Sequence, residues 1–357
     1  MSGVEPSLAA VNFEGYTCPL PIQKHEVVVM GHGSGGRLSR DLITRLFLPG
    51  LGQAAPRVLD DSATLMVNGT RLALTTDSHV VAPLTFPGGD IGRLAVCGTV
   101  NDLAMVGAAP LALTSGFVLE EGLPLDELER IVRSMQAAAA EAGVSILAGD
   151  TKVVQKGGAD RLFINTAGVG VIPEGVDISG ANAQPGDAVI LSGTIGDHGI
   201  AVLSAREDLG FETELLSDVA PLNHLVAAML AAGTLHVLRD PTRGGLATAL
   251  NEIAEQSGVA IELDERLIPL RPAVSAACEM LGFDPLYVAN EGKLVACVPA
   301  AQAQAVLRAM RAAPYGADAV IVGQVRPGPS GQVTLKTQIG GTRLLDMLAG
   351  EMLPRIC

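Results

Sequence analysis

The chain is 357 residues long, with 48% hydrophobic and 17% charged residues, which favours two globular α/β domains of about 150–200 residues each. Its 38 acidic residues outnumber 24 lysines and arginines, for a formal charge of −14. This charge repels nucleic acid and anionic membranes, which excludes functions that need either partner, and an anionic substrate such as ATP needs a divalent cation such as Mg²⁺ between it and the protein.

The cysteines are odd in number, widely spaced and without a CxxC pair, which argues against a disulfide framework or a zinc ribbon. They are Cys18, Cys97, Cys278, Cys297 and Cys357. The first 25 residues lack a basic start followed by an apolar core, and no uncharged apolar run reaches the length of a membrane span. We therefore expect a soluble protein of the reducing cytoplasm.

The predicted elements of the first half follow an extension, residues 1–25, in which two prolines exclude a helix. Strands are expected, the last two of them buried, in HEVVVM (25–30), LALTTD (72–77), LALTSGFVL (111–119), VSILAGD (144–150) and LFINTAGVGVI (162–172). The segment 123–143 has apolar residues at helical spacing and closes on Gly143, which predicts a helix.

A stretch rich in proline and glycine, residues 173–186, predicts a domain junction. A second α/β run follows it. Its expected strands are AVILSG (188–193), KLVACV (293–298) and ADAVIVGQV (317–325), and its expected helices are APLNHLVAAMLAAG (220–233), GGLATALNEIAEQSG (244–258) and AAQAQAVLRAMRAA (300–313). Residues 350–357 have no partner in this arrangement and are too short to fold alone.

The stretch GHGSGGRLS (31–39) precedes an amphipathic segment that is expected to be helical. A glycine loop there offers unhindered backbone N–H groups to a phosphate. The glycines also fit GxGxxG, with Asp60 at about the distance of a ribose-binding acid, so the dinucleotide site of an oxidoreductase is a competing interpretation. A Walker A loop is excluded because Arg37 and Leu38 replace its Lys and its Ser or Thr. A loop without a ligand is the third interpretation.

Polar side chains stand at the ends of apolar strands and on one expected helix. They are Asp60, Asp61, Asp77, Asn101, Asp102 and Asp150. A helix cap or a turn explains any single one, but so many in one domain favour oxygen ligands for magnesium on a polyphosphate. Lys152 is either a surface lysine or a group that neutralises phosphoryl charge or moves a proton.

Two motifs of the second half carry further acids. RDPTRGGL places Asp240 before a helix, and NEGKL sets Glu291 in a turn before a strand. Ordinary turn chemistry explains both about as well as catalysis does. In GTIGDHG, we expect His198 to be structural rather than a metal ligand, because no second histidine lies at ligand spacing.

Cys357 is the last residue of the chain, whereas the other four cysteines are expected to pack in apolar surroundings or lie in the extension. Its position is either an accident of where the chain stops or the tip of an arm. Pro354 stiffens the approach, Arg355 supplies a cation and Gly350 offers a hinge. Seven extended residues span roughly 25 Å, so we expect a swinging arm that moves the sulfur between two protein surfaces.

Together these motifs resemble the HypE family of [NiFe]-hydrogenase maturation factors. The resemblance runs from about Val27 to Cys357 through HGSGG, TTDSHVVAPLTFPGGDIGRLAVCGTVNDLAMVGA, GFVLEEGLP, GDTKVVQKG, FINTAGVG, SGTIGDHG, RDPTRGG, NEGKLV and the closing PRIC. Aminoimidazole ribonucleotide synthetase and selenophosphate synthetase share the glycine and aspartate motifs but not PRIC. The extension 1–25 departs from the family because it is longer than usual.

The resemblance implies an α/β (α+β) fold of two synthetase-like domains. Residues 26–172 would bind ATP and pair with a second copy into a β-barrel, residues 173–349 would form an α/β sandwich, and 350–357 a mobile tail. ATP would lie in the clefts between the domains of this homodimer. The resemblance also implies the reaction: HypF loads a carbamoyl group onto Cys357, the chain dehydrates it to a thiocyanate with ATP, and the cyano group passes to iron on the HypC–HypD complex.

The same resemblance assigns roles by motif. Catalysis falls to Cys357 as the carrier and to Glu291 and Lys152, which handle protons. ATP would be bound by Gly33, Ser34, Gly35, Gly36, Asp77, Asn101, Asp102, Asp150 and Asp240. Magnesium would be held by Asp61, Asp77, Asp102 and Asp150.

Three alternatives stay open. The chain resembles synthetases that phosphorylate a diffusible substrate, an amide or a selenide, and such an enzyme would be indifferent to losing PRIC. A scaffold that binds a metal or a protein would use Cys357 as a ligand for a soft metal. The dinucleotide-dependent oxidoreductase is the third.

Overall fold

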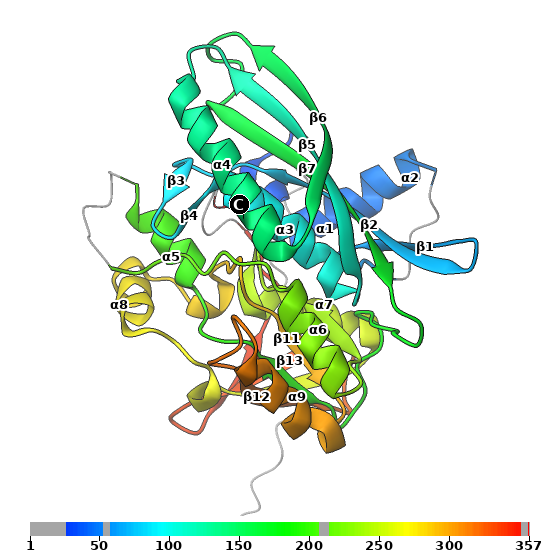
Figure 1. The fold of residues 1–357 in the computed structure, drawn as a ribbon. Helices are drawn as coiled ribbons and strands as arrows, with labels where there is room; N and C mark the ends of the chain where they lie inside the picture. The colour runs from blue at the N-terminus through cyan, green and yellow to red at the C-terminus, as the bar shows by residue number, and fades with distance from the viewer. Residues whose placement is uncertain (1–25, 53–57, 207–213, 351–355, 357) are drawn as a thin grey trace, which may run out of the picture.

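The computed structural model describes residues 26–52, 58–206, 214–350 and 356. The extension 1–25, residues 351–355 of the predicted mobile tail and Cys357 lie outside these residues. Two sheets, one in each half of the chain, organise the mixed α/β fold (Figure 1). In the part of the chain that is described, no helix combines the length and the apolar character needed to cross a bilayer.

The N-terminal half is organised around a five-stranded sheet. Its order is β1 (Ala63–Val67), β2 (Thr70–His79), β7 (Leu162–Ile172), β5 (Ala109–Glu120) and β6 (Ser145–Val154). Neighbouring strands run antiparallel except β5 and β6, which are parallel. The short strands β3 (Thr85–Phe86) and β4 (Gly89–Asp90) pair separately. The strands expected at 72–77, 111–119 and 162–172 are confirmed.

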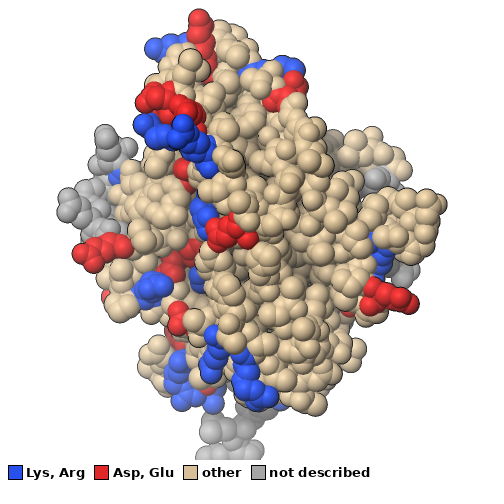
Figure 2. All heavy atoms as spheres, in the orientation of Figure 1, with Lys and Arg blue, Asp and Glu red and all other residues tan. Residues whose placement is uncertain are grey.

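Strand β6 corrects one expectation. The run at 144–150 was predicted to be a buried strand, but β6 is exposed along most of its length, with Leu147 74% and Val153 68% exposed. It is an edge strand, and the helices α3 and α4 lie together on one side of the sheet (Figure 1). The apolar residues of a strand indicate that it tends to be buried, but they do not indicate what would bury it. Figure 2 shows few charged side chains over β5, β6 and β7 in this view.

Helix α3 (Ile91–Met105) is the buried centre of the N-terminal half. It begins after Asp90, whose side chain accepts a hydrogen bond from Arg93 N at 2.9 Å and so caps the first turn. The sheet lies on one side of α3 and the C-terminal half on another, so nearly every residue of the helix is buried. Helix α4 (Leu125–Ala142) covers it and ends at Gly143 with φ of 71°, as the sequence predicts.

The segment around the glycine loop is helical on both sides. The strand expected at 25–30 is wrong for the described residues 26–30, because Val27 and Val28 are 71% and 78% exposed and pair with no strand. A 3₁₀ turn, η1 (Met30–Gly33), stands there instead. The predicted helix after the loop is confirmed, as α1 (Arg37–Leu42), the π-helical η2 (Ile43–Phe47) and α2 (Leu48–Gly50).

The C-terminal half contains a seven-stranded sheet. Its order is β14 (Thr342–Leu345), β13 (Gln332–Lys336), β10 (Ala260–Asp264), β12 (Val320–Arg326), β8 (Ala188–Leu191), β11 (Val295–Val298) and β9 (Val237–Arg239). Only β13 and β10 run parallel. Strands β8 and β11 are buried throughout because both faces of the sheet are covered there.

The described residues of the C-terminal half form the helices α5 (Asp197–Ser204), α6 (Asn223–Ala232), α7 (Gly245–Ser257), α8 (Pro272–Leu281) and α9 (Ala300–Ala312), with 3₁₀ turns η4 (Glu265–Leu267) and η5 (Pro285–Tyr287). Helix α7 packs on one face of the second sheet and α6 and α9 on the other, whereas α5 and α8 pack against each other. The strands expected at 188–193, 293–298 and 317–325 and the helices expected at 220–233, 244–258 and 300–313 are confirmed with shorter ends.

The packing of the C-terminal half can be tested at Gly292, where two backbone segments approach each other closely. A Cβ atom at Gly292 would lie 1.7 Å from the carbonyl oxygen of Asp218, so Gly292→Ala must displace one of the two segments. We expect the free energy of unfolding, measured by urea titration, to fall by about 1–3 kcal/mol, as overpacking costs in cores. Gly50→Ala is the matched control, because a Cβ atom there meets nothing within 4 Å. Equal stability of the two variants would contradict the close approach of Gly292 to Asp218.

Candidate active site

A cavity of about 560 Å³ lies between the two halves of the chain. The glycine loop, the end of β2, helix α3 and the segments after β9 and before β11 all contribute to its wall. Its acidic side chains are Asp60, Asp61, Asp77, Asp102, Asp240, Glu252 and Glu291. Segments that are far apart in the sequence therefore bring an unusual density of negative charge to one place.

The glycine loop closes one end of this cavity. Gly33 and Gly35 line it, and Arg243 donates from Nη1 to the carbonyl oxygen of Gly33 at 3.2 Å. Gly35 has φ of 77°, and a Cβ atom there would lie 2.6 Å from Cβ of Arg243. A Cβ atom at Gly36 would lie 2.1 Å from the carbonyl oxygen of Leu348. The glycines therefore let the loop pack against the C-terminal half as well as face the cavity.

The dinucleotide interpretation lacks its structural context. A pyrophosphate-binding GxGxxG loop joins a strand of a parallel sheet to a helix. Among the described residues before Gly31 no strand is present, so the loop does not follow a strand there. Asp60, the candidate ribose acid, accepts hydrogen bonds from Ser179 Oγ at 2.9 Å and Gly180 N at 2.7 Å. Asp60 thus joins the two halves.

Asp61 lies in the cavity wall beside Arg239. Nε of Arg239 is 3.4 Å from Oδ1 of Asp61, and the same guanidinium is paired with Glu252 and donates to the carbonyl oxygen of Leu59 at 2.9 Å. Burial raises the pKa of Asp61 well above its usual range, which Arg239 opposes and Asp240 reinforces. One arginine therefore balances only part of this negative charge.

In the acids deeper in the cavity, burial and repulsion outweigh the opposing effects of Arg239 on Asp240 and of Arg243 on Glu291. Burial, reinforced by repulsion from Asp240, raises the pKa of both Asp102 and Glu291 well above the usual range. Burial also raises the pKa of Asp240 to about 6. Oδ2 of Asp102 accepts a hydrogen bond from Thr75 Oγ1 at 2.8 Å, but Oε1 of Glu291 is buried without a hydrogen-bond partner among the described residues. Such a cluster favours a bound cation.

Asp77 faces the same cavity from the end of β2. Its Oδ1 accepts the N–H of Ser78 at 2.7 Å, and its Oδ2 lies 3.5 Å from Nε2 of the buried His79. Burial lowers the pKa of His79, so this imidazole stays neutral more readily than usual. A Cβ atom at Gly98 on α3 would lie 2.9 Å from His79 Cε1. Gly98, which the sequence did not single out, is needed for this close packing.

Asn101 does not line the cavity, and neither do Ser34 and Gly36. The buried Asn101 side chain donates from Nδ2 to the carbonyl oxygens of Ala220 at 3.0 Å and Glu291 at 3.2 Å. Its Oδ1 accepts the N–H of Leu222 at 2.8 Å. Asn101 thus holds the turn of Glu291 against helix α3.

Asp150 and Lys152 also lie away from the cavity within one chain. Both stand on the exposed strand β6, where Lys152 Nζ is 2.6 Å from Oδ2 of Asp150. The hydrogen bond from Lys152 lowers the pKa of Asp150. Of the four predicted magnesium ligands, the structure therefore brings together Asp61, Asp77 and Asp102, but not Asp150.

The acidic cavity suits a cation that arrives with its own ligands. In the described part of the chain, no three His, Cys, Asp or Glu side chains form a ready metal site. Mg²⁺ on a nucleotide takes several ligands from phosphate and water and needs only one or two carboxylates. The incompletely balanced buried carboxylates of Asp61, Asp102 and Asp240 are hard oxygen donors that fit this ion.

A buried ion pair behind Glu291 escaped the sequence analysis. Asp218 Oδ1 accepts the N–H of Glu291 at 3.0 Å, and its Oδ2 lies 3.2 Å from Lys293 Nζ. The carboxylate of Asp218 and the amine of Lys293 are 3% and 13% exposed. Lys293 belongs to the NEGKL motif, but no local pattern connects it with Asp218, which is distant in sequence. The pair fixes the backbone of Glu291 from behind.

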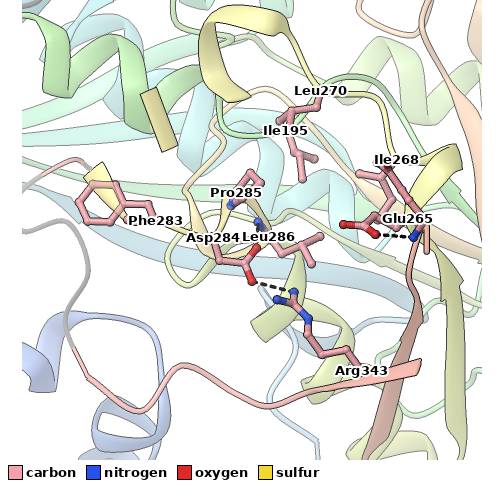
Figure 3. A pocket seen from close by; sticks show the side chains of 11 residues that line it. Ile195, Glu265, Ile268, Leu270, Phe283, Asp284, Pro285, Leu286 and Arg343 are labelled. Carbon is pink, nitrogen blue, oxygen red and sulfur yellow. Dashed lines mark hydrogen bonds and ion pairs between the residues drawn. The ribbon is translucent and has the colours of Figure 1, made fainter. Parts of the chain in front are cut away.

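A second cavity, of about 400 Å³, lies within the C-terminal half (Figure 3). Its acids are paired: Arg343 donates to Asp284 at 2.7 Å, and the N–H of Gln338 donates to Glu265 at 2.8 Å. Ile195, Leu270 and other apolar side chains supply much of the remaining wall. This cavity lacks the unbalanced charge of the first, which is therefore the candidate active site.

Comparison with known proteins first defines the class. The model of the AIR synthase related protein N-terminal domain matches residues 59–172, and that of the C-terminal domain matches residues 184–336. These matches cover most of the chain, including the segments that carry the acids of the cavity. The chain therefore has the fold of an AIR synthase related protein.

Individual relatives narrow this class. Carbamoyl dehydratase HypE of Cupriavidus necator is 56% identical over 345 residues, which cover 96% of this chain and 98% of that protein. A chain in the crystal structure of a HypE–HypF complex is 51% identical with a TM-score of 0.81, covering 86% of this chain and 99% of its own. HypE in complex with ATP is 50% identical with a TM-score of 0.78, covering 93% and 100%. This chain belongs to the HypE family.

The destabilising effect of the buried Glu291 carboxylate can be measured. Its pKa is raised in the folded protein, mainly by burial, so the folded state binds the proton more tightly than the unfolded state. Stability is therefore lost as pH rises from about 4.3, the usual glutamate value, through the folded pKa. Without nucleotide or metal at about pH 8, Glu291→Gln should raise the free energy of unfolding by on the order of 1 kcal/mol or more.

Asp264 is the control for this titration. A hydrogen bond from Arg266 lowers its pKa to about 2, so its contribution is present at neutral pH and lost in acid. Asp264→Asn should therefore not stabilise the protein at pH 8. A lower free energy of unfolding for Glu291→Gln at pH 8 would contradict a destabilising effect of the buried Glu291 carboxylate.

Proposed function

We propose that this protein is an ATP-dependent carbamoyl dehydratase that acts on a carbamoyl group carried by its own Cys357 and supplies the cyano ligand for the iron of [NiFe]-hydrogenase. One observation carries the proposal. The acidic cavity between the two halves belongs to a chain 56% identical over almost its whole length to carbamoyl dehydratase HypE. The solved complex of a HypE with ATP supports the nucleotide as co-substrate.

The reaction removes water from a thiocarbamate. The carbamoyl oxygen attacks the γ-phosphorus of ATP, so a C–O–P bond forms and ADP leaves. The nitrogen then loses both protons, the C–O bond breaks with phosphate as the leaving group, and a C≡N bond forms. The oxygen of the lost water ends on phosphate, and the products are thiocyanate, ADP and phosphate. Phosphorylation is needed because a carboxamide oxygen is a poor leaving group.

Glu291 is the proposed proton acceptor. Its raised pKa makes the ionised carboxylate a stronger base than an ordinary glutamate, and Oε1 has no partner among the described residues. Asn101 holds the carbonyl group of this residue and Asp218 holds its N–H. A base whose backbone N–H and carbonyl group are both held by hydrogen bonds keeps its position while the carrier moves.

Mg²⁺ is proposed to accompany ATP. Asp61, Asp77 and Asp102 are the residues that would hold it, one or two of them as direct ligands, and Gly33 and Gly35 present the loop for phosphate while Asp240 assists at the cavity wall. When bound, the ion neutralises charge on the transferred phosphoryl group. The three carboxylates in turn orient the nucleotide within the cavity.

A homodimer accounts for the placement of Asp150 and Lys152. Both are exposed on edge strand β6, and Leu74, Leu111 and Leu147 are also exposed on this sheet. We propose that a second copy covers this surface and that Asp150 and Lys152 serve the cavity of the partner subunit. Pairing of the N-terminal sheets into a barrel would bury apolar side chains that one chain leaves in water.

Two further partners follow from the family. The solved HypE–HypF complex supports HypF as the source of the carbamoyl group. The HypC–HypD complex is the proposed acceptor of the cyano group. We place the reaction in the cytoplasm, a proposal supported by the free thiols of Cys97, Cys278 and Cys297 among the described cysteines.

Intact mass tests the reaction. With ATP and Mg²⁺, the carbamoylated protein should lose the mass of one water on Cys357. Cys357→Ala, or one residue added after Cys357, should abolish this loss while ATP binding persists. Glu291→Gln should slow it by roughly a hundredfold or more, the usual contribution of a general base. ATP consumption that survives removal of PRIC and responds to a small amide or selenide would instead identify a diffusible substrate.

Mixing variants tests the contribution of the partner subunit. Asp150→Asn and Glu291→Gln homodimers should each be inactive, but exchanged subunits should regain part of the activity. In the mixed dimer one cavity would carry both changes and the other neither. Sedimentation of each variant checks that dimers persist. If mixing restores nothing while subunits exchange, Asp150 acts within its own chain.

A further inference from the structure

The residue before Cys357 is anchored in the protein. Ile356 is only 5% exposed and packs in an apolar cluster that includes Val81, Leu84 and Phe86. It forms a short antiparallel bridge with Val81. Its carbonyl oxygen lies 2.5 Å from Nε2 of His198. Both the side chain and the main chain of this residue therefore have dedicated contacts.

The hydrogen bonds around His198 define which nitrogen carries the proton. A carbonyl oxygen can only accept, so Nε2 of His198, which lies 2.5 Å from the carbonyl oxygen of Ile356, carries the hydrogen. In the neutral ring Nδ1 is then the acceptor, 2.8 Å from Ser217 Oγ, whose hydroxyl donates to it. Ser217 Oγ in turn accepts the N–H of Val219 at 3.1 Å. Burial lowers the pKa of His198, in agreement with a neutral ring.

Three segments hold this arrangement in place. His198 lies in the first turn of α5, with its ring edge-on to Phe86 at a centroid distance of 5.3 Å. The N–H of Ser217 donates to the carbonyl oxygen of Pro87 at 2.8 Å. The N–H of Gly199 donates to the carbonyl oxygen of Ala289, two residues before Glu291. Contacts from both halves of the chain thus meet at Ile356, next to the segment that carries the proposed base.

We propose that Val81, His198 and Ser217 form a receptor for the penultimate residue of the chain, and that His198 is a positioning residue for the carrier thiol. The carbonyl group that His198 holds is bonded to the nitrogen of Cys357, so docking of Ile356 limits where the thiol can lie. The role in catalysis rests on the proposed function, whereas docking itself does not. The apolar pocket selects the side chain, and His198 recognises the main chain.

Thiol accessibility tests the receptor without ATP or a carbamoyl group. In the full chain carrying Cys18→Ser, the described cysteines are buried, so slow alkylation followed by intact mass reports on Cys357. His198→Phe keeps a ring against Phe86 but removes the donor, and should raise the alkylation rate about tenfold, the effect of losing one buried hydrogen bond. His198→Gln, which retains an N–H donor, should stay close to the parent.

A second pair of variants leaves the core of the receptor unchanged. Ile356→Gly should raise the alkylation rate as His198→Phe does, and Ile356→Val should not. Equal alkylation rates in all four variants would overturn the receptor. If His198→Phe fails to fold, equal rates in Ile356→Gly and Ile356→Val would overturn it as well.

Positioning adds a kinetic expectation. In the carbamoylated chain, His198→Phe should lower the single-turnover rate of water loss while the ATP dissociation constant stays unchanged, and His198→Gln should restore most of the rate. A normal rate in His198→Phe would limit the receptor to a resting anchor and refute the positioning role. If alkylation follows the prediction but no variant, parent included, loses water, the receptor stands and the proposed function fails.

Discussion

The side chain of Asn101 joins the two halves of the molecule at the point where the active site forms. It makes hydrogen bonds to three backbone groups of the C-terminal half, at Ala220, Leu222 and Glu291, from the centre of buried helix α3. Because an unpaired buried amide is costly, these bonds hold the halves in one relative position. The acidic cavity exists only in that position.

The cavity shows what this rigid frame supports. Asp77 contributes to the raised pKa of Asp102, Asp240 and Glu291, and Asp240 to that of the other two, whereas Arg239 opposes the shift at Asp240. In the unliganded protein this arrangement costs stability. The cost is offset when a nucleotide arrives with its cation, so repulsion in the free protein favours ligand binding.

A stationary site needs a carrier that moves toward it. The proposed reaction places the chemistry at Glu291 and the substrate on Cys357. The anchored residue Ile356 precedes Cys357 directly, so its contacts with His198 and Val81 restrict the positions that the carrier can take. A hydrogen bond to a main-chain carbonyl together with one apolar side chain holds a tail specifically without making its release prohibitively slow. In the proposed homodimer, the exposed strand β6 in turn brings Asp150 and Lys152 to the cavity of a second copy of the chain.

Periodicity in the sequence was sufficient to predict most strands and helices, and its motifs indicated the family and singled out Asp61, Asp77, Asp102 and Glu291, which line one cavity, because periodicity and motifs depend on local chain order. Tertiary structure alone decided which distant segments meet. It exposed β6, replaced a strand before the glycine loop with a turn, and paired His198 with Ile356. Such contacts depend on how separate elements pack, and no local pattern encodes that packing.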